Sequence, residues 1–281
     1  MMRGITKLAG MLGLATVLVA GVANAEPKSK LDEVLERGKL IVGTGSTNAP
    51  WHFMDKDGKL SGFDIDVSKI IAKALFDDPE KVEFVNQSGD SRIPNLTTNK
   101  VDITCQFMTV TGGRAQQVEF SIPYYREGVG LLLKAGGKYK SYAELKAAGS
   151  KVVVSVLQNV YAEDMVHQAL PQAKVDQYDS VDLIYQALNS GRADAAATDQ
   201  SALRWYMQQN PKLYADAGYG WNPQTYSCAV KRGDQVWLNF VNTALHEAMT
   251  GVEFGTYSAS FEKWFGVKLD SPQIGFPVEY K

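Results

Sequence analysis

Residues 55–75 read DKDGKLSGFDIDVSKIIAKAL, a polar turn followed by a helical pattern. Asp57-Gly58 favours a tight turn, and Asp64 is placed to cap the helix that follows. Short apolar runs on either side predict strands at 39–43, 81–85 and 101–107, with a short helix at 91–98. This alternation indicates a parallel sheet covered by helices on both faces. The helix prediction rests on apolar residues at helical spacing: Ile65, Val67, Ile70, Ile71, Ala74 and Leu75.

The second half of the chain repeats this α/β pattern. Helices are predicted at 141–147, where Ser141 is the cap, and at 161–170, 180–190 and 199–209. Strands are predicted at 151–157, 174–178, 193–198 and 226–231, followed by helices at 234–249 and 254–264. We expect two packed lobes joined by extended segments near 124–130 and 223–226. Ligands of open α/β sheets bind at the carboxyl ends of strands, so a small molecule would lie between the lobes.

The first 25 residues predict export. Arg3 and Lys7 precede an uncharged run from Leu8 to Val22, and Ala23-Asn24-Ala25 supplies small residues for cleavage. The alternative is a membrane anchor, but this run is rich in Gly and Ala, whereas a spanning helix needs about 20 predominantly apolar residues. No cysteine lies near the cleavage site, so we expect no lipid anchor and a mature protein that begins near residue 26.

Composition narrows the classes of partner. The 29 Lys and Arg residues and 31 Asp and Glu residues give a net charge of −2, which offers nucleic acid or an anionic membrane no particular attraction. Cys105 and Cys228 are the only cysteines. An exported protein can join them in one disulfide, or they can remain two buried free thiols, and the sequence leaves both alternatives open.

The residues show no constellation typical of an enzyme or a metal site. His52, His167 and His246 lie far apart and lack the spacing of metal ligands. The chain has no Gly-x-Ser-x-Gly elbow, and Gly43-Thr44-Gly45-Ser46 lacks the third glycine of a dinucleotide-binding loop. We therefore expect neither a cofactor nor catalysis.

A series of motifs runs from Leu40 to Gly266 and carries a family resemblance. In this order they resemble the family 3 solute-binding proteins, periplasmic receptors of ABC importers for polar amino acids. The motifs are Gly62-Phe63-Asp64-Ile65-Asp66-Val67, Ile93-Pro94-Asn95-Leu96 with Val101-Asp102-Ile103, Met108-Thr109-Val110-Thr111 with Arg114, Val118-Glu119-Phe120-Ser121 with Pro123-Tyr124-Tyr125, Gly191-Arg192-Ala193-Asp194-Ala195, and Lys263-Trp264-Phe265-Gly266.

The resemblance implies a fold and a function. The fold is the two-lobe, type II periplasmic-binding-protein fold, each lobe a mostly parallel sheet with flanking helices, and two crossover segments form the hinge. One lobe comprises residues 26–129 and 223–281, and the other comprises residues 130–222. The function is to bind a free amino acid in the periplasm, as a monomer, and to deliver it to an ABC permease.

The resemblance also assigns the groups that hold the amino acid. Arg114 offers a planar fork for the ligand carboxylate, with Thr109 and Phe107 nearby on the preceding strand. Asp199 follows the apolar run 195–197 and is assigned to the ligand ammonium. The alternatives are a surface salt bridge for Arg114 and a helix N-cap for Asp199.

Side-chain selectivity is predicted from residues around the first lobe. Relatives that bind acidic amino acids carry an arginine at the position of Arg92, so we expect a glutamate, aspartate or amide ligand. The alternative is that Arg92 pairs with Asp90 or Asp102. Asn48 and Gly89 occupy positions where relatives have stacking aromatics. Trp51 is either a nearby substitute for them or part of the core.

The second lobe departs from the family pattern in one loop. Where relatives often have Gly-Thr-Thr, this chain has Asn159-Val160-Tyr161, ahead of a helix N-terminus that favours anionic groups. We expect these three residues to contact ligand, with Tyr161 as the only hydroxyl among them.

Two other functions remain as alternatives to a transport receptor. An exported dehydratase of the cyclohexadienyl type shares this fold and needs a general acid, for which Glu163, Asp164 and His52 are candidates. Turnover of arogenate or prephenate would reveal it. The other alternative is a ligand sensor that acts with a signalling partner.

Overall fold

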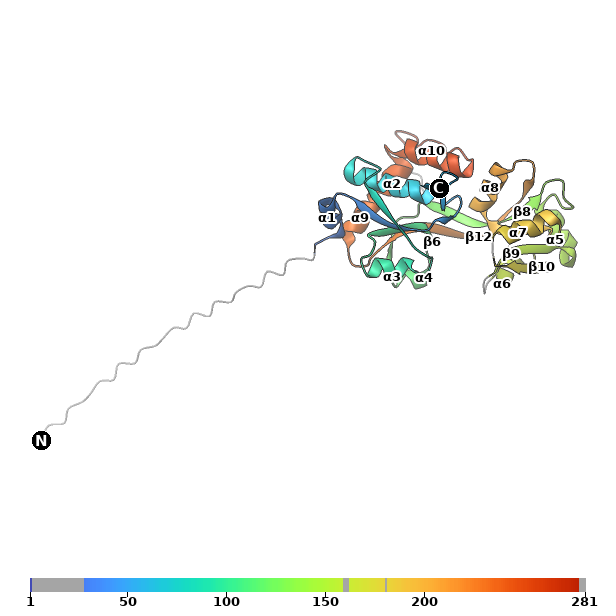
Figure 1. Ribbon diagram of the computed structural model, residues 1–281, viewed down its shortest axis with the longest axis horizontal. Coiled ribbons are helices and arrows are strands. Elements are labelled where there is room, and N and C mark those ends of the chain that lie inside the picture. The colour runs from blue at the N-terminus through green and yellow to red at the C-terminus, as the bar shows by residue number, and fades with distance from the viewer. Residues whose placement is uncertain (2–27, 159–161, 180, 278–281) are drawn as a thin grey trace.

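The computed structural model describes Met1 and residues 28–158, 162–179 and 181–277. The predicted signal at 1–25 therefore lies outside the described residues, apart from Met1. Two α/β lobes lie side by side, and the long strands β8 and β12 run between them (Figure 1). None of the described helices has the length and apolar character that a membrane crossing needs.

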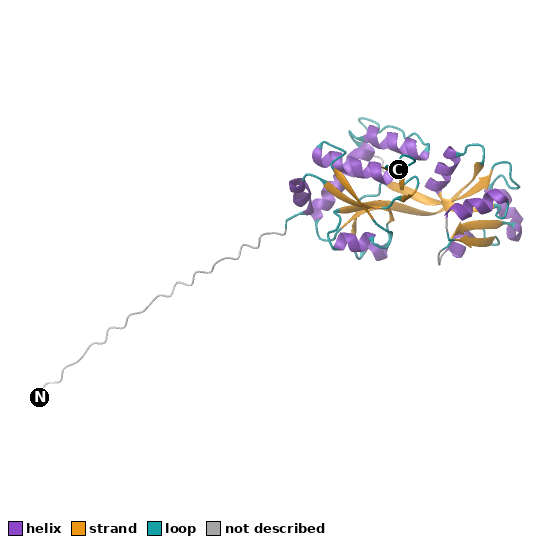
Figure 2. Cartoon of the chain, in the orientation of Figure 1, coloured by secondary structure: helices purple, strands orange, loops and turns teal. Residues whose placement is uncertain are grey.

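The elements alternate as the sequence predicts. Helices lie on both sides of the strands in each lobe (Figure 2). In chain order, the elements are α1 (Lys30–Arg37), β1 (Leu40–Thr44), β2 (Thr47–Asn48), β3 (His52–Met54), β4 (Leu60–Ser61), α2 (Phe63–Phe76), β5 (Val82–Asn86), α3 (Arg92–Thr97), β6 (Ile103–Thr109), α4 (Gly112–Ala115), β7 (Glu119–Phe120), β8 (Tyr125–Lys134), α5 (Tyr142–Ala148), η1 (Gly149–Lys151), β9 (Val153–Leu157), α6 (Ala162–Ala169), β10 (Lys174–Tyr178), α7 (Val181–Ser190), β11 (Ala195–Asp199), α8 (Gln200–Gln209), β12 (Tyr214–Val230), α9 (Gln235–Thr250) and α10 (Phe254–Phe265).

One sheet extends through both lobes in the order β10-β9-β11-β8-β12-β6-β1-β5, with β7 beside β12. β1 is parallel to β5 and β6, and β9 is parallel to β10 and β11, so the predicted mostly parallel sheets are confirmed. β8 and β12 are antiparallel to each other. The segments between the lobes are therefore long paired strands, where the sequence predicts only short extended connections.

The buried cores divide the chain between the lobes. One core takes its buried residues from 34–125 and 226–265, and the other from 129–221. The predicted lobe boundaries at 129/130 and 222/223 fall within β8 and β12. In β8, Leu131 and Leu133 contact one cluster of the second lobe while Leu132 contacts another, because successive side chains of a strand point to opposite faces.

The entry to α2 corrects one prediction. The N-cap residue is Gly62, not Asp64, and its φ of 133° lies in a region that glycine tolerates. A Cβ at Gly62 would lie 2.2 Å from the carbonyl oxygen of Trp51, so only glycine fits there. Asp64 lies inside the first turn with no exposed surface. Its carboxylate accepts hydrogen bonds from His52, Tyr124 and Phe107, which is why it does not cap the helix.

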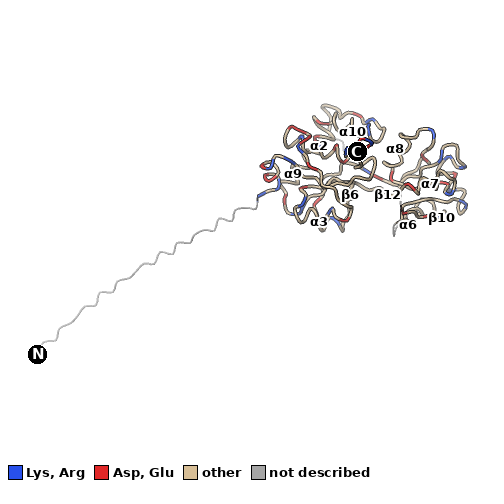
Figure 3. The backbone as a smooth tube through the Cα atoms, viewed as in Figure 1, with Lys and Arg blue, Asp and Glu red and all other residues tan. Residues whose placement is uncertain are grey.

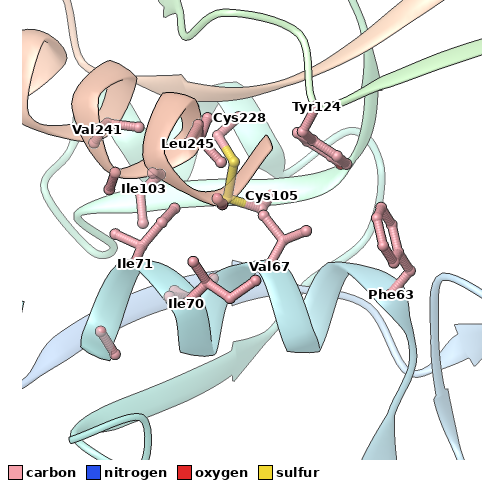
Figure 4. Packing of buried hydrophobic residues seen from close by; sticks show 14 of the residues in the cluster. Phe63, Val67, Ile70, Ile71, Ile103, Cys105, Tyr124, Cys228, Val241 and Leu245 are labelled. Atoms are coloured by element: carbon pink, nitrogen blue, oxygen red, sulfur yellow. A yellow bond between two sulfur atoms is a disulfide. The ribbon is translucent and has the colours of Figure 1, made fainter. Parts of the chain in front are cut away.

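Cys105 of β6 and Cys228 of β12 form a disulfide in the first-lobe core, against the Val67 face of α2 (Figure 4). Their positions are 123 residues apart in sequence. A link between such distant positions stabilises the fold mainly by restricting the unfolded chain. The bond also fixes one end of β12 to the first lobe.

Candidate ligand-binding site

Arg114 lies in the short helix α4, directly after β6. Thr111 caps this helix by accepting a hydrogen bond from the Arg114 amide at 3.3 Å. The guanidinium donates through Nη1 to the carbonyl oxygen of Thr109 at 2.9 Å. No carboxylate of the described residues lies within ion-pair distance of Arg114. Arg114 therefore does not form the surface salt bridge that the alternative proposes. Its guanidinium is half-buried and has no carboxylate partner among the described residues.

Asp199 ends β11 and occupies the N-cap position of α8. Its side chain makes no capping hydrogen bond. Oδ2 instead accepts a hydrogen bond from the hydroxyl of Tyr226 at 3.4 Å. Asp199 is therefore the N-cap residue of α8, as the alternative proposes, but its carboxylate does not cap the helix. The start of a helix also favours a negative charge at this point.

Tyr226 lies between Arg114 of the first lobe and Asp199 of the second. Its backbone in β12 pairs with Thr109 of β6 on one side and with Tyr125 of β8 on the other. Its hydroxyl meets Asp199, while the carbonyl of its partner Thr109 accepts from Arg114. Sequence reasoning missed Tyr226, which is only 2% exposed. Nothing in the pattern of its strand separates it from other buried aromatics.

Phe107 has an unusual backbone conformation beside the site. Its φ is 32°, a value that residues with side chains seldom adopt. The Phe107 amide donates to Oδ2 of Asp64 at 2.9 Å, and its ring stacks on His52 with centroids 4.7 Å apart. Asp64 and His52 therefore hold Phe107 in this conformation.

Arg92 lies over the ring of Phe107, with its guanidinium carbon 5.9 Å from the ring centroid. It donates to the carbonyl oxygens of Gly89 at 2.8 Å and Gln106 at 3.0 Å. Neither Asp90 nor Asp102 forms the predicted alternative ion pair, and Asp102 is instead paired with Arg37. Burial lowers the pKa of Arg92, and the positive charge of Arg114 lowers this pKa further. The first lobe thus presents two neighbouring cations.

Trp51 belongs to the first-lobe core, as one of the two alternatives proposes. It is 4% exposed and makes edge contacts with Tyr125 and Tyr226 at centroid distances of 4.8 and 5.1 Å. Its indole Nε1 donates to Oγ of Ser201 at 3.0 Å, which links the first lobe to α8. Asn48 is exposed on β2, and its amide nitrogen lies 3.2 Å from Nε2 of His52.

α8 is in contact with both lobes. Leu203 is buried in a cluster of the second lobe. Trp205, two residues later, lies against Phe53 and Trp264 of the first lobe at centroid distances of 5.9 and 5.7 Å. The helix that follows Asp199 is therefore positioned by both cores.

Glu127 is a further acidic residue that sequence reasoning missed. It lies on β8 with 3% of its surface exposed. Oε1 accepts hydrogen bonds from the amides of Gly128 at 2.9 Å and Ser201 at 3.3 Å. Burial, and then the charge of Asp199, raises the pKa of Glu127 to about 7. Burial likewise raises the pKa of Asp199 to about 6, against the opposing hydrogen bond from Tyr226.

The remaining predicted residues are not brought together. Asn159, Val160 and Tyr161 lie outside the described residues. Among the candidate general acids, His52 is fully buried in the first lobe, and Glu163 and Asp164 are exposed on α6. The described residues contain no group of His, Cys, Asp and Glu able to hold a metal. A cavity of about 200 Å³ lies between α5 and the loop after α6, and neither Arg114 nor Asp199 lines it.

The fold and the site define a class of protein: a two-lobe binding protein with two cations on one lobe, the Asp199 carboxylate on the other lobe and the Glu127 carboxylate on a strand that joins them. Residues 40–267 match the model of the bacterial extracellular solute-binding proteins, family 3. The chain belongs to this family.

Named relatives span nearly the whole chain. The ABC transporter glutamine-binding protein GlnH of Bacillus subtilis is 29% identical over 94% of this chain and 97% of its own length. The L-cystine-binding protein TcyJ of Escherichia coli is 30% identical over 93% of this chain and 96% of its own length. Among solved structures, an ancestral cationic amino acid solute-binding protein superposes with a TM-score of 0.73 at 36% identity, covering 84% of this chain and 100% of that one.

Proposed function

We propose that this protein is a receptor that binds a free polar amino acid between its lobes and delivers it to an ABC permease. The observation that carries the proposal is a pair of opposite charges on different lobes. Arg114 has no carboxylate partner among the described residues, and the Asp199 carboxylate is not used for capping. An α-amino acid carries the two complementary charges, and the relatives named for glutamine and cystine are binding proteins.

Contact with both lobes is what allows a ligand to change the conformation. A ligand shifts an equilibrium between open and closed forms only by its difference in affinity for them. With its carboxylate on Arg114 and its ammonium on Asp199, one zwitterion would gain its full set of contacts only when the lobes close. Export by the signal at 1–25 would place this monomeric receptor in the periplasm.

The side chain of the ligand is proposed to be acidic or an amide. Arg92 lies beside Arg114, and its described contacts are two backbone carbonyls and a ring face. A second carboxylate, or an amide oxygen, would complement this second cation. Basic side chains would instead meet two positive charges.

A thermal-shift screen against the common amino acids tests the proposal. A ligand that binds only the folded protein at a concentration 100 times its Kd raises the free energy of unfolding by about 2.7 kcal/mol. We expect one or a few polar amino acids to raise the melting temperature in a concentration-dependent way. If no amino acid does so, while the folded protein shows a cooperative transition, the receptor proposal is wrong.

The Arg92→Ala variant tests the preference for acidic ligands. Loss of one charge-assisted hydrogen bond is expected to lower the affinity for glutamate or aspartate by about tenfold. The affinity for a neutral amino acid should change much less. Titration calorimetry measures both affinities. Arg192→Ala removes an exposed arginine of the second lobe and serves as the matched control. Equal weakening of acidic and neutral ligands by Arg92→Ala would contradict a selective role.

A further inference from the structure

Two carboxylates are neighbours at the point where β11 leads into α8. Asp199 of β11 is paired with Val129 of β8, and Glu127 lies two residues before Val129. Residues two apart on a strand point to the same face of the sheet. Glu127 therefore lies on the same face as Val129 and as Asp199, the partner of Val129. The Ser201 amide, two residues beyond Asp199, donates to Glu127 Oε1, which places both acids at the start of α8.

Glu127 is not fully satisfied where it is buried. Oε1 has two amide donors, but Oε2 has no hydrogen-bond partner in the part of the chain that the structure describes. A buried ionised carboxylate with an unfilled oxygen is costly, and a second carboxylate beside it adds repulsion. A proton or a cation shared by the pair would remove both costs.

Glu127 also fixes the position of the helix that carries the ligand contact. Its carboxylate holds the Ser201 amide, while the Ser201 hydroxyl accepts from Trp51 of the first lobe at 3.0 Å. Through these two hydrogen bonds, Ser201 connects Trp51 in the first-lobe core to Glu127 on β8, the strand between the lobes.

We propose that Glu127 is a positioning residue, and that Glu127 and Asp199 form a two-carboxylate subsite that holds one proton in the ligand-free protein and releases it when a ligand ammonium binds. This inference rests on the proposed function, because the ammonium is that of the amino acid. In the exchange an O–H bond breaks and the proton passes to solvent. The pair gains one negative charge while the ammonium supplies one positive charge.

The other groups that face the pair do not account for a proton released near neutrality. Tyr125 of β8 and Tyr226 of β12 lie beside the acids, and burial raises the pKa of each above that of an ordinary tyrosine. Tyr257 of α10 lies near Tyr125, and burial raises the pKa of Tyr257 as well. Arg204 of α8 also lies beside Tyr125.

Titration calorimetry in buffers of different ionisation enthalpy counts the protons. The probe is L-glutamine, whose side chain does not ionise, with L-arginine or L-cystine in its place if glutamine does not bind. The wild-type protein should release between about 0.3 and 1 proton per bound ligand near pH 7. The affinity of the wild-type protein for the probe should rise as the pH passes upward through the raised pKa of the pair. Below that pKa, the affinity should fall by up to about tenfold for each pH unit.

Glu127→Gln is the informative variant, because a glutamine keeps an oxygen for the Gly128 and Ser201 amides but removes the charge. The midpoint of the affinity profile should then move to lower pH, because Asp199 no longer has a second carboxylate beside it that raises the pKa of the pair. At pH 8 the variant should bind about five- to tenfold more weakly than wild type. Glu83→Gln, at an exposed glutamate of β5, is the control for loss of one charge.

The outcomes separate this inference from the function on which it rests. Failure of every probe to bind would reject the receptor proposal and the subsite with it. Binding without proton release between about pH 5.5 and 8 would leave the receptor intact and overturn the subsite. A Glu127→Gln variant that binds more weakly with an unchanged midpoint would show that Glu127 only supports the fold.

Discussion

Asp199→Ala is expected to weaken amino-acid binding by more than 100-fold. Removing one member of a desolvated, hydrogen-bonded charge pair costs about 3–5 kcal/mol, because the ligand ammonium then loses its partner without regaining water. The hydroxyl of Tyr226 would also lose its acceptor. Titration calorimetry with the amino acid found in the thermal-shift screen measures the change.

Two further variants make this result specific. Asp199→Asn keeps the shape and one acceptor oxygen but not the charge, so its loss should be smaller than that of the alanine variant. Asp176→Ala removes an exposed aspartate of β10 in the same lobe and should leave affinity unchanged. An Asp199→Ala protein that retains wild-type affinity would show that the ammonium is held elsewhere.

Asp64→Ala is expected to lower the free energy of unfolding by about 5 kcal/mol. The substitution leaves three buried donors without an acceptor: Nδ1 of His52, the hydroxyl of Tyr124 and the amide of Phe107. Each unsatisfied buried group costs about 1–3 kcal/mol. Chemical denaturation followed by circular dichroism gives the free energy of unfolding.

Asp57→Ala, in the exposed turn between β3 and β4, is the control and should change stability by less than about 0.5 kcal/mol. Asp64→Asn retains an acceptor oxygen, so it should lie between the alanine variant and wild type. A loss below about 1 kcal/mol in Asp64→Ala would mean that the three donors find other partners. That result would also mean that the hydrogen bond from the Phe107 amide to Asp64 does not hold Phe107 in its unusual backbone conformation.

Much of the fold could be predicted because local patterns determine it. The apolar spacing after Gly62 specifies α2, and Ser141 caps α5 by accepting from the Glu144 amide, as predicted. The error at Asp64 has a physical origin. An acid in the first turn of a helix fits a cap and fits a buried hydrogen-bond acceptor equally well, and only the packing of β3 and β6 against α2 decides between them.

The site was less accessible to sequence reasoning. Arg114 and Asp199 could be proposed because the family resemblance assigns them, and Asp199 also follows an apolar strand. Their ligand roles stay predictions that the binding experiments address. Glu127 was missed because a charged residue after Tyr125 in an extended segment looks exposed. It is buried because β8 is covered at this point by the start of α8, an arrangement that depends on contacts between distant segments. Tyr226 was missed because it is one of many buried aromatics, and only the folded structure places its hydroxyl beside Asp199.

The pairing of β8 with β12 has an evolutionary consequence. Gly130 lies opposite Gly220 and Val129 opposite Trp221, so the chain enters and leaves the second lobe through adjacent strands. Everything between them is one uninterrupted insert whose two ends are neighbours, the arrangement in which exchange of a whole segment disturbs a host fold least. The insert carries Asp199, whereas its host carries Arg92 and Arg114. Recombination at these two strands would therefore join the residue proposed to hold the ammonium in one receptor to the residues proposed to hold the carboxylate and side chain in another, and would change selectivity without a single point mutation.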